Sequence, residues 1–539
     1  MLAGVNLERS EHASTVIGGA TRTRLARVAD FGQTVAQAYA TQGEAIQLGQ
    51  GVHDGALVHE AVVQVPLKMM NRHGLIAGAT GTGKTRTLQI LAEQLSAAGV
   101  SVFLADVKGD VSGIADPGDP SSAAGKRAAD LEIPFAPTGF PAEYLSLGGI
   151  GPGVPVRATV SDFGPQLLGK VLESNETQEQ SLQLVFRYAD QKGLPLLDLS
   201  DLRALLTFLD SDEGKAELTG IGGLSSQTIG VLLRALVGLE DGGGTEFFGE
   251  PMFQIADLVR TAPDSRGIVT CLELPAVQDK PKLFSTALMW MLAELFEALP
   301  EVGDLPKPKL VFFFDEAHLL FDGATKAFLE SITQTVRLIR SKGVGVFFIT
   351  QVPKDIDDDV LGQLGNRIQH ALRAFTPDDA KALHEAVKTY PKSDFYDLAQ
   401  LLTQLGIGEA AVTILSDSGV PTPVVHTRLR PPASRMGPTD DVDRAAKASP
   451  LFARYGTRVD NQSAREMLAA RMAQQAAPST TGGAAPTSAP QPEAHHRETA
   501  TAVAGGAAVL GAMLNSPAGR QAEREVIRGV FGMLKKSLR

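Results

Sequence analysis

Eight consecutive residues, GATGTGKT, have the types and spacing needed to hold a polyphosphate. They match the pattern G-x-x-x-x-G-K-[ST] and comprise Gly78, Ala79, Thr80, Gly81, Thr82, Gly83, Lys84 and Thr85. The glycines permit a sharp turn that aims backbone N–H groups at phosphate oxygens. Lys84 offers a charge to the β- and γ-phosphates, and Thr85 offers a hydroxyl to Mg²⁺ at the positive end of a helix. The motif therefore predicts a site for ATP and Mg²⁺.

A second group of chemical residues follows the apolar run Leu310–Phe314 in the stretch LVFFFDEAHLLFD. If this run is a buried strand, it delivers Asp315 and Glu316 to the carboxyl edge of a sheet, where ligands bind in open α/β folds. We expect Asp315 to hold Mg²⁺ through water and Glu316 to polarise the attacking water.

The letters D-E-A-H in this stretch raise the alternative of a DEAH-box RNA helicase. Such an enzyme places its acid box much closer to the phosphate loop, and it carries an S-A-T motif and a later Q-x-x-G-R-x-G-R run. The sequence has neither motif. We therefore interpret Ala317 and His318 as incidental to an ATPase acid pair.

Polar residues also follow and precede the next apolar run, VGVFFITQ. Gln351 ends it, and an amide there can hydrogen-bond both the γ-phosphate and the attacking water. Arg337 and Arg340 lie before it at the end of a predicted helix, which we expect near the same sheet edge. Either arginine is a candidate for a finger that serves a neighbouring subunit's nucleotide.

The elements that must position these residues alternate in type along the chain. Continuous apolar runs, typical of strands covered on both faces, alternate with helical patterns, which predicts an α/β fold with a mostly parallel sheet. The runs are HGLIAG, VSVFLAD, GIVTCLELP, KLVFFFDE, VGVFFIT, RIQHALRAF and EAAVTIL.

The remaining segments differ in composition and predict a division of the chain into parts. Residues 1–70 form a small β-rich module, residues 71–115 and 266–430 form the ATPase core, and residues 116–265 form an α-helical insertion. Residues 431–497, rich in Pro, Ala and Ser, are predicted to be a disordered linker. Residues 498–539 end in a basic amphipathic segment that docks on a partner or, in the alternative, on a membrane surface.

Composition bounds the class of protein. The chain has 539 residues and a net charge of −11, which argues against a generally basic nucleic-acid-coating protein while leaving room for a local basic channel. The single cysteine, Cys271, excludes a disulfide framework and a cysteine zinc cluster. No secretory signal is visible, and the apolar run Thr501–Leu514 is too short to span a bilayer. We expect a cytoplasmic protein with no integral membrane segment.

Several of these stretches together resemble a known group. Residues 71–115, the stretch FFDEAHLLF and the stretch LIRSKGVGVFFITQ are similar to the HerA/FtsK group of hexameric, RecA-like motor ATPases. The similarity is greatest to the bacterial HerA-like helicase C-terminal family.

The resemblance implies more than the residues do by themselves. It implies a RecA-like P-loop core, a homo-hexamer, and ATP-driven movement along double-stranded DNA. It also implies that Gln351 is a sensor and that the finger arginine precedes its strand, which favours Arg340, then Arg337 and then Arg367. The alternative is an ATP-driven protein remodeller or switch without DNA translocation, whose unidentified partner binds the helical insertion or the C-terminal segment. A nucleotide-binding scaffold with little turnover is disfavoured by the intact catalytic set.

A few other residues stand out less. Lys108 and Asp110 in ADVKGD face the nucleotide or a pore, or only form a turn. His495 and His496 form a pair in the linker, which we do not interpret as a metal site, and Trp290 is expected in the core or at a subunit interface.

Overall fold

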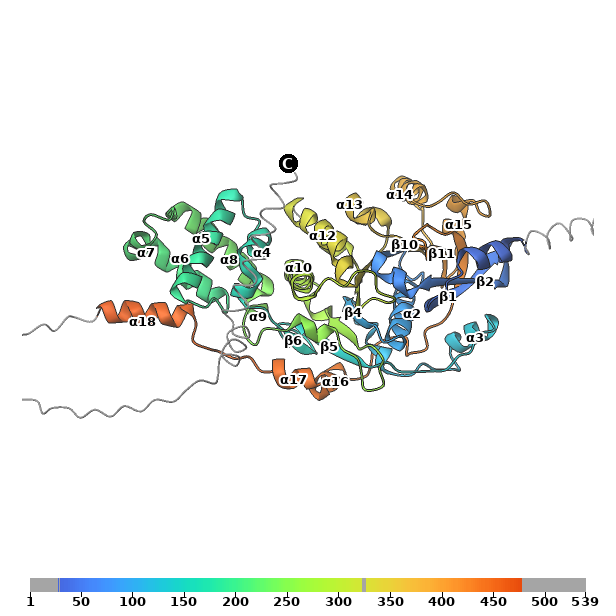
Figure 1. Cartoon of the computed structure of the whole chain (residues 1–539), viewed down its shortest axis with the longest axis horizontal. Helices are drawn as coiled ribbons and strands as arrows, with labels where there is room; N and C mark the ends of the chain where they lie inside the picture. Colours follow the sequence, from blue (N-terminus) through green and yellow to red (C-terminus); the bar gives the residue numbers. More distant parts are fainter. Residues whose placement is uncertain (1–27, 29, 322–325, 477–539) are drawn as a thin grey trace, which may run out of the picture. The chain divides into compact units, whose positions relative to one another are not determined.

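The computed structural model describes residues 28, 30–321 and 326–476, and a single twelve-stranded sheet runs through this part of the chain (Figure 1). The strand order is β2-β1-β12-β11-β10-β3-β9-β8-β4-β7-β5-β6. From β10 to β6 in this order, every neighbouring pair is parallel. These parallel strands are β3 (Gly74–Ala77), β4 (Ser101–Asp106), β5 (Ala142–Leu147), β6 (Val154–Val156), β7 (Val269–Glu273), β8 (Leu310–Phe314), β9 (Val344–Thr350) and β10 (Asn366–Gln369). The predicted α/β fold with a mostly parallel sheet is confirmed.

The central strands are apolar because both of their faces are covered. Every residue of β4, β7, β8 and β9 is buried. Aromatic rings tie the neighbouring strands together: Phe103 and Phe312 have centroids 4.5 Å apart, and Phe314 stacks on Phe348 at 5.5 Å. The covering helices include α2 (Lys84–Ala97), α10 (Pro281–Ala298) and α12 (Lys326–Ile339). This packing makes the sheet a rigid support for residues at its carboxyl edge.

The other strands run antiparallel and come from both ends of the described chain. They are β1 (Ala45–His53), β2 (Ala56–Pro66), β11 (Glu409–Thr413) and β12 (Val425–Leu429). The predicted β-rich N-terminal segment is therefore a hairpin that joins the main sheet by pairing β1 with β12. Because β11 is antiparallel to β10, the start of β11 lies at the edge where β3 and β10 end.

Five helices between β6 and β7 form most of the helical insertion, and Figure 1 shows α5 to α8 grouped together. They are α4 (Val160–Val171), α5 (Glu176–Lys192), α6 (Leu199–Asp210), α7 (Asp212–Glu217) and α8 (Ser226–Leu239). Asn175 and Asp198 cap α5 and α6 through side chains that accept backbone N–H groups, as polar residues at these starts predict.

The insertion predicted for residues 116–265 is too broad. It contains β5 and β6, which extend the parallel sheet beyond β7. β5 carries polar residues, β6 has only three residues with a proline in the middle, and glycines surround both, so their apolar pattern is too weak to identify from sequence.

The linker predicted for residues 431–497 is wrong for residues 431–476. This part contains α16 (Val442–Ala448), α17 (Pro450–Tyr455) and α18 (Ala464–Ala476). A few buried residues, among them Leu451, Tyr455 and Leu468, anchor an otherwise polar segment. The Tyr455 hydroxyl also donates to Asp257 at 2.6 Å. The rest of the linker, with His495 and His496, and the C-terminal segment lie outside the described residues.

No helix within residues 28, 30–321 and 326–476 is both long enough and apolar enough to cross a bilayer.

Candidate active site

The phosphate-loop motif connects β3 to α2, as the sequence predicts. Gly78 has φ +153°, and a Cβ there would lie 2.5 Å from the Cβ of His370. Gly83 has φ +114° and caps the start of α2. Both positions therefore require glycine for conformation, and Gly78 requires it for space as well.

Backbone hydrogen bonds fix this loop to its neighbours in the sheet. The Gly78 N–H donates to the carbonyls of Thr350 at 3.2 Å and Gln351 at 3.1 Å, and the Ala79 N–H donates to Ala371 at 2.8 Å. The loop is thus held between the ends of β9 and β10. Gln351 lies beside the first glycine, and its side chain is exposed, while its role as a sensor stays a prediction.

Lys84 begins α2, and only 6% of the residue is exposed. Its ammonium group donates to the carbonyls of Gly78 at 2.7 Å and Ala79 at 3.3 Å, so it lies inside the curve of the loop. Burial lowers the pKa of Lys84, while the nearby carboxylates of Glu316 and Asp315 oppose that shift. Thr85 follows it, half-buried, in the first turn of α2.

Asp315 directly follows β8, which is separated from β3 only by β9. The residue is 2% exposed, and its Oδ1 accepts a hydrogen bond from the Glu316 N–H at 2.9 Å. Its Oδ2 is buried and accepts no hydrogen bond from any described residue. Burial, reinforced by the charge of Glu316, raises the pKa of Asp315 to about 7. A divalent cation would supply the missing partner, so this side chain fits the predicted Mg²⁺ ligand.

Glu316 has the left-handed backbone value φ +49° and is 7% exposed. Positive φ is uncommon for a residue with a side chain, and such strain often occurs at functional sites. Its Oε1 forms an ion pair with the Lys108 ammonium, and its Oε2 lies 3.3 Å from the Nδ1 of His318. The structure therefore brings Lys108, singled out in the sequence without a settled role, to the acid pair.

The acid pair belongs to a larger carboxylate cluster. One carboxylate oxygen from each of Asp106, Asp110 and Asp315 lies within 4.8 Å of the others, which is close enough for the three side chains to share a divalent cation. Glu273 lies next to Asp106 in the register of β4 and β7. Burial first, and then the charge of Asp106, raises the pKa of Glu273 to about 8.

Sequence reasoning missed Asp106 and Glu273, although a signal was present. Each ends a buried strand, as Asp315 follows one, and parallel strands deliver such residues to the same edge. Asp106 also organises the turn that carries Lys108. Its carboxylate accepts hydrogen bonds from three backbone N–H groups, those of Lys108 at 3.2 Å, Gly109 at 2.7 Å and Val111 at 2.9 Å.

His370 was also missed, and it lies behind the phosphate loop. It is fully buried, and its ring Nε2 lies 2.9 Å from the Thr87 hydroxyl. The backbone N–H of His370 donates to the Ala77 carbonyl at 2.7 Å. Burial, with a smaller effect from Lys84, lowers its pKa to about 4, so the ring is neutral at pH 7. A neutral imidazole supports the loop without adding charge to the phosphate site.

Arg340 lies away from the other predicted residues. It ion-pairs with Asp304 at 3.6 Å, beside Arg72, and leads into the start of β9, whereas Gln351 follows the end of that strand. Seven residues of strand separate the two positions by roughly 20 Å. The expectation that Arg340 lies near the phosphate edge of its own subunit is wrong, because a helix that precedes a parallel strand ends at the amino edge. Its role toward a neighbouring subunit stays a prediction.

The two other candidate arginines have different environments. Arg337 is exposed on α12. The guanidinium of Arg367 donates to the carbonyls of Leu361, Leu364 and Thr389 and lies 6.0 Å from the ring centroid of Tyr390. These contacts give Arg367 a structural role, and Arg367 would have to lose them to reach a neighbouring subunit's nucleotide.

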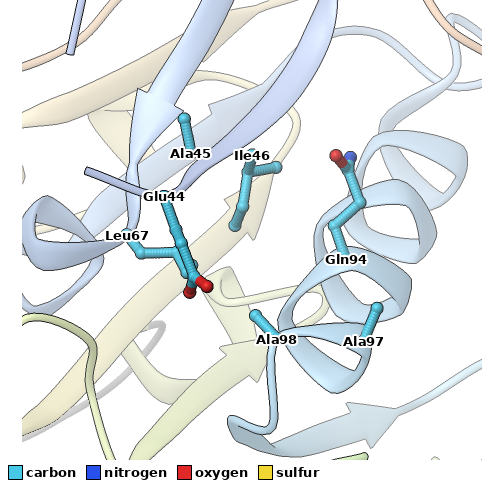
Figure 2. Close-up of a pocket in the computed structure, with 7 residues that line it drawn as sticks. All are labelled: Glu44, Ala45, Ile46, Leu67, Gln94, Ala97 and Ala98. Atoms are coloured by element: carbon cyan, nitrogen blue, oxygen red, sulfur yellow. The ribbon is translucent and has the colours of Figure 1, made fainter. Parts of the chain in front are cut away.

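A cavity of about 350 Å³ lies at the opposite end of α2 from the phosphate loop (Figure 2). Glu44, Ala45, Ile46, Leu67, Gln94, Ala97 and Ala98 line it. Gln94 makes two hydrogen bonds with the backbone of Gln47, at 2.9 and 3.0 Å. The side-chain amide of Gln94 is therefore already hydrogen-bonded within the protein, and the cavity lies apart from the acid cluster.

The sequence profile of the helicase HerA-like C-terminal family matches residues 54–539. A probable helicase of Methanocaldococcus jannaschii is 31% identical over 138 residues, a match that covers 25% of this chain and 24% of that protein. The chain thus matches about a quarter of that relative's length.

Solved structures with a similar arrangement share little sequence. The bacterial conjugative coupling protein TrwB is 15% identical with a TM-score of 0.47, and the match covers 75% of this chain and 94% of TrwB. VirB4 of Thermoanaerobacter pseudethanolicus is 16% identical with a TM-score of 0.46, over 72% of this chain and 97% of VirB4. TrwB has also been solved in complex with ADP and Mg²⁺.

Proposed function

The chain belongs to the helicase HerA-like C-terminal family, and from that premise we propose that it is a Mg²⁺-dependent ATPase that works as a HerA/FtsK-type motor. The observation that carries the proposal is the meeting of the phosphate loop, Asp315 and Glu316 at one edge of the sheet. A loop alone would indicate only nucleotide binding. The buried acid pair beside it supplies the groups that hydrolysis needs.

Each residue of the edge has a distinct task in this proposal. The loop N–H groups and Lys84 bind the β- and γ-phosphates, and Thr85 and Asp315 hold Mg²⁺, with Asp106 and Asp110 close enough to share it. Mg²⁺, when bound, neutralises charge that develops on the phosphate oxygens. Glu316 orients and polarises the attacking water, and Gln351 reports the state of the γ-phosphate to the adjoining loop.

We further propose that the enzyme acts in the cytoplasm as a homo-hexameric ring that moves double-stranded DNA. The family's helicase designation supports this proposal, as does the resemblance of the motifs to ring motors. In such a ring each site is completed by a neighbour, and Arg340 is the first candidate finger, followed by exposed Arg337.

A protein remodeller is the second candidate, because two observations favour it. The helical insertion exposes two large apolar side chains, Ile221 at 48% and Val237 at 46%. The net charge of −11 also favours a partner other than nucleic acid. An unidentified protein could use this insertion, or the C-terminal segment, as its docking site.

The test is the rate of ATP hydrolysis by the purified chain with and without linear double-stranded DNA. We expect stimulation of several-fold that disappears in the Lys84→Ala variant. Hydrolysis that DNA leaves unchanged would favour the remodeller, and absence of hydrolysis under any condition would refute the enzymatic proposal.

A further inference from the structure

A short loop outside the predicted motifs, residues 406–408, lies directly against the phosphate loop. It precedes β11, whose start lies at the same sheet edge as the end of β3. The Gly408 N–H donates to the Thr82 carbonyl at 3.0 Å. A Cβ on Gly83 would lie only 3.3 Å from the Gly408 nitrogen. Loop 406–408 therefore packs directly against the second half of the phosphate loop.

Two side chains, one from another part of the chain and one from the residue that follows the loop, hold loop 406–408 in place. Arg127, on α3 (Ala123–Asp130), donates to the carbonyls of Ile407 and Gly408, each at 2.8 Å. The Glu409 carboxylate accepts a hydrogen bond from the Gly406 N–H at 2.9 Å and lies 3.0 Å from the Nε2 of His426. The backbone of the loop is thus fixed by charged groups on both sides.

Ile407 stands at the tip of this braced loop and is 71% exposed. A single exposed apolar side chain is ordinary on a protein surface. Ile407 differs because its backbone is anchored both to a guanidinium and, through the next residue, to the phosphate loop. The Ile407 side chain is thus an exposed apolar group whose backbone is fixed beside the phosphate loop.

The arrangement of residues along the carboxyl edge of the sheet indicates which part of a bound nucleotide lies near Ile407. Asp315, Glu316 and Gln351 lie on the side of β3 that faces β9 and β8, so the terminal phosphate must point that way. Loop 406–408 lies on the other side, with β10 and β11. The end of the nucleotide that carries the base therefore extends toward Ile407.

We propose, on the basis of the ATPase function above, that Ile407 is the platform on which the nucleobase packs. Its branched side chain covers one flat face of a purine, and Arg127 positions it without touching the base. Apolar contact with a ring face does not distinguish exocyclic groups, so the platform accepts adenine and guanine alike.

A new tryptophan provides a direct test. The chain has one tryptophan, Trp290, which is fully buried. In the Ile407→Trp variant, the added indole should report an arriving base by a change in fluorescence. We expect Mg-ATP and Mg-GTP to change the emission in a saturable way and Mg-tripolyphosphate, which has no base, to leave it unchanged.

Affinity measurements by calorimetry provide the second arm. The Ile407→Ser variant should bind ATP and GTP roughly tenfold more weakly, the change expected when a buried apolar contact is lost, and bind tripolyphosphate as the wild type does. The control is Val420→Ser, since Val420 is 59% exposed in the turn beyond the far end of β11. That variant should bind all three ligands as the wild type does.

Three results would overturn the proposal in distinguishable ways. Unchanged ATP affinity in Ile407→Ser would remove the platform and leave the ATPase proposal standing. Equal weakening of ATP and tripolyphosphate would show that the loop only shapes the phosphate site. Failure of the wild type to bind either ligand would refute the nucleotide function and the platform together.

Discussion

Glu316 combines a strained backbone with a carboxylate that Lys108 holds by one oxygen, while the other oxygen is buried and accepts no hydrogen bond from the described residues. We expect the Glu316→Gln variant to bind ATP normally and to hydrolyse it at least 10²-fold more slowly, because the amide cannot polarise water. Equilibrium binding of a labelled nucleotide and steady-state turnover separate the two effects. Lys84→Ala is the comparison, since it should lose binding itself. Wild-type turnover in Glu316→Gln would show that another group is the base.

Lys108 holds one oxygen of Glu316 through its ammonium group, from a turn built by Asp106. We expect Lys108→Met to lower turnover roughly tenfold with ATP affinity unchanged, because the carboxylate loses the partner that orients it. Lys108→Arg should restore part of the rate, since it keeps the charge. An increase in turnover in Lys108→Met would instead identify the ion pair as a restraint on hydrolysis.

At the scale of elements, the ends of three parallel strands gather carboxyl groups that only a few cations balance. Glu273 ends β7, and its pKa is raised to about 8 in the folded protein, compared with about 4.5 in the unfolded chain. As the pH falls, the folded protein therefore binds a proton at Glu273 near pH 8, whereas the unfolded chain binds it only near pH 4.5. Stability from this group is therefore greatest at low pH and is lost as the pH rises toward 8.

The Glu273→Gln variant should remove this pH dependence. Its free energy of unfolding should exceed that of the wild type by an amount that grows between pH 5 and pH 8, on the order of a few kcal/mol. Urea unfolding curves at the two pH values measure the difference. A constant difference across this range would mean that Glu273 titrates normally in the folded state.

Helix α2 begins at the phosphate loop and also binds the segment that follows residue 430, and this second contact provides another test. Its Glu93 carboxylate is buried and accepts hydrogen bonds from the N–H groups of Ala433 and Ser434, both at 2.8 Å. We expect Glu93→Ala to lower stability by about 2–3 kcal/mol, because one buried and one partly buried donor lose their acceptor. Proteolysis should then begin after residue 430 before the core is cut. Equal protection of that segment in the variant would show that its apolar anchors suffice.

The strands and the phosphate loop were predictable because their signals are local. Each central strand is an uninterrupted apolar run, and the loop motif is contiguous. Asp106 and Glu273 end buried strands, which is a local signal, but only the order of strands in the sheet shows that these residues and loop 406–408 lie at the site. Arg340 shows the same limit, because its distance along the chain from Gln351 did not reveal that the two lie at opposite edges.

At the scale of the whole molecule, the proposed ring requires that one subunit complete the site of the next. We expect light scattering to show a hexamer that ATP stabilises. Arg340→Ala and Lys84→Ala should each be inactive alone, yet mixing them should restore some hydrolysis where an intact loop meets an intact arginine. Full activity of Arg340→Ala would move the finger to Arg337, and a monomer under all conditions would remove the ring.

The pairing of β1 with β12 has a consequence for the chain during its synthesis. Gly49 lies opposite Leu429, so the first long hairpin leaves the ribosome without its partner strand. At a synthesis rate of about 5–20 residues per second, β12 follows β1 after roughly 20–80 s, and during this interval one row of N–H and C=O groups on β1 is unpaired. Open strand edges invite pairing with other chains. Translation of this protein therefore includes an interval of aggregation risk, and we expect chains that stop before residue 425 to depend on chaperones or to precipitate.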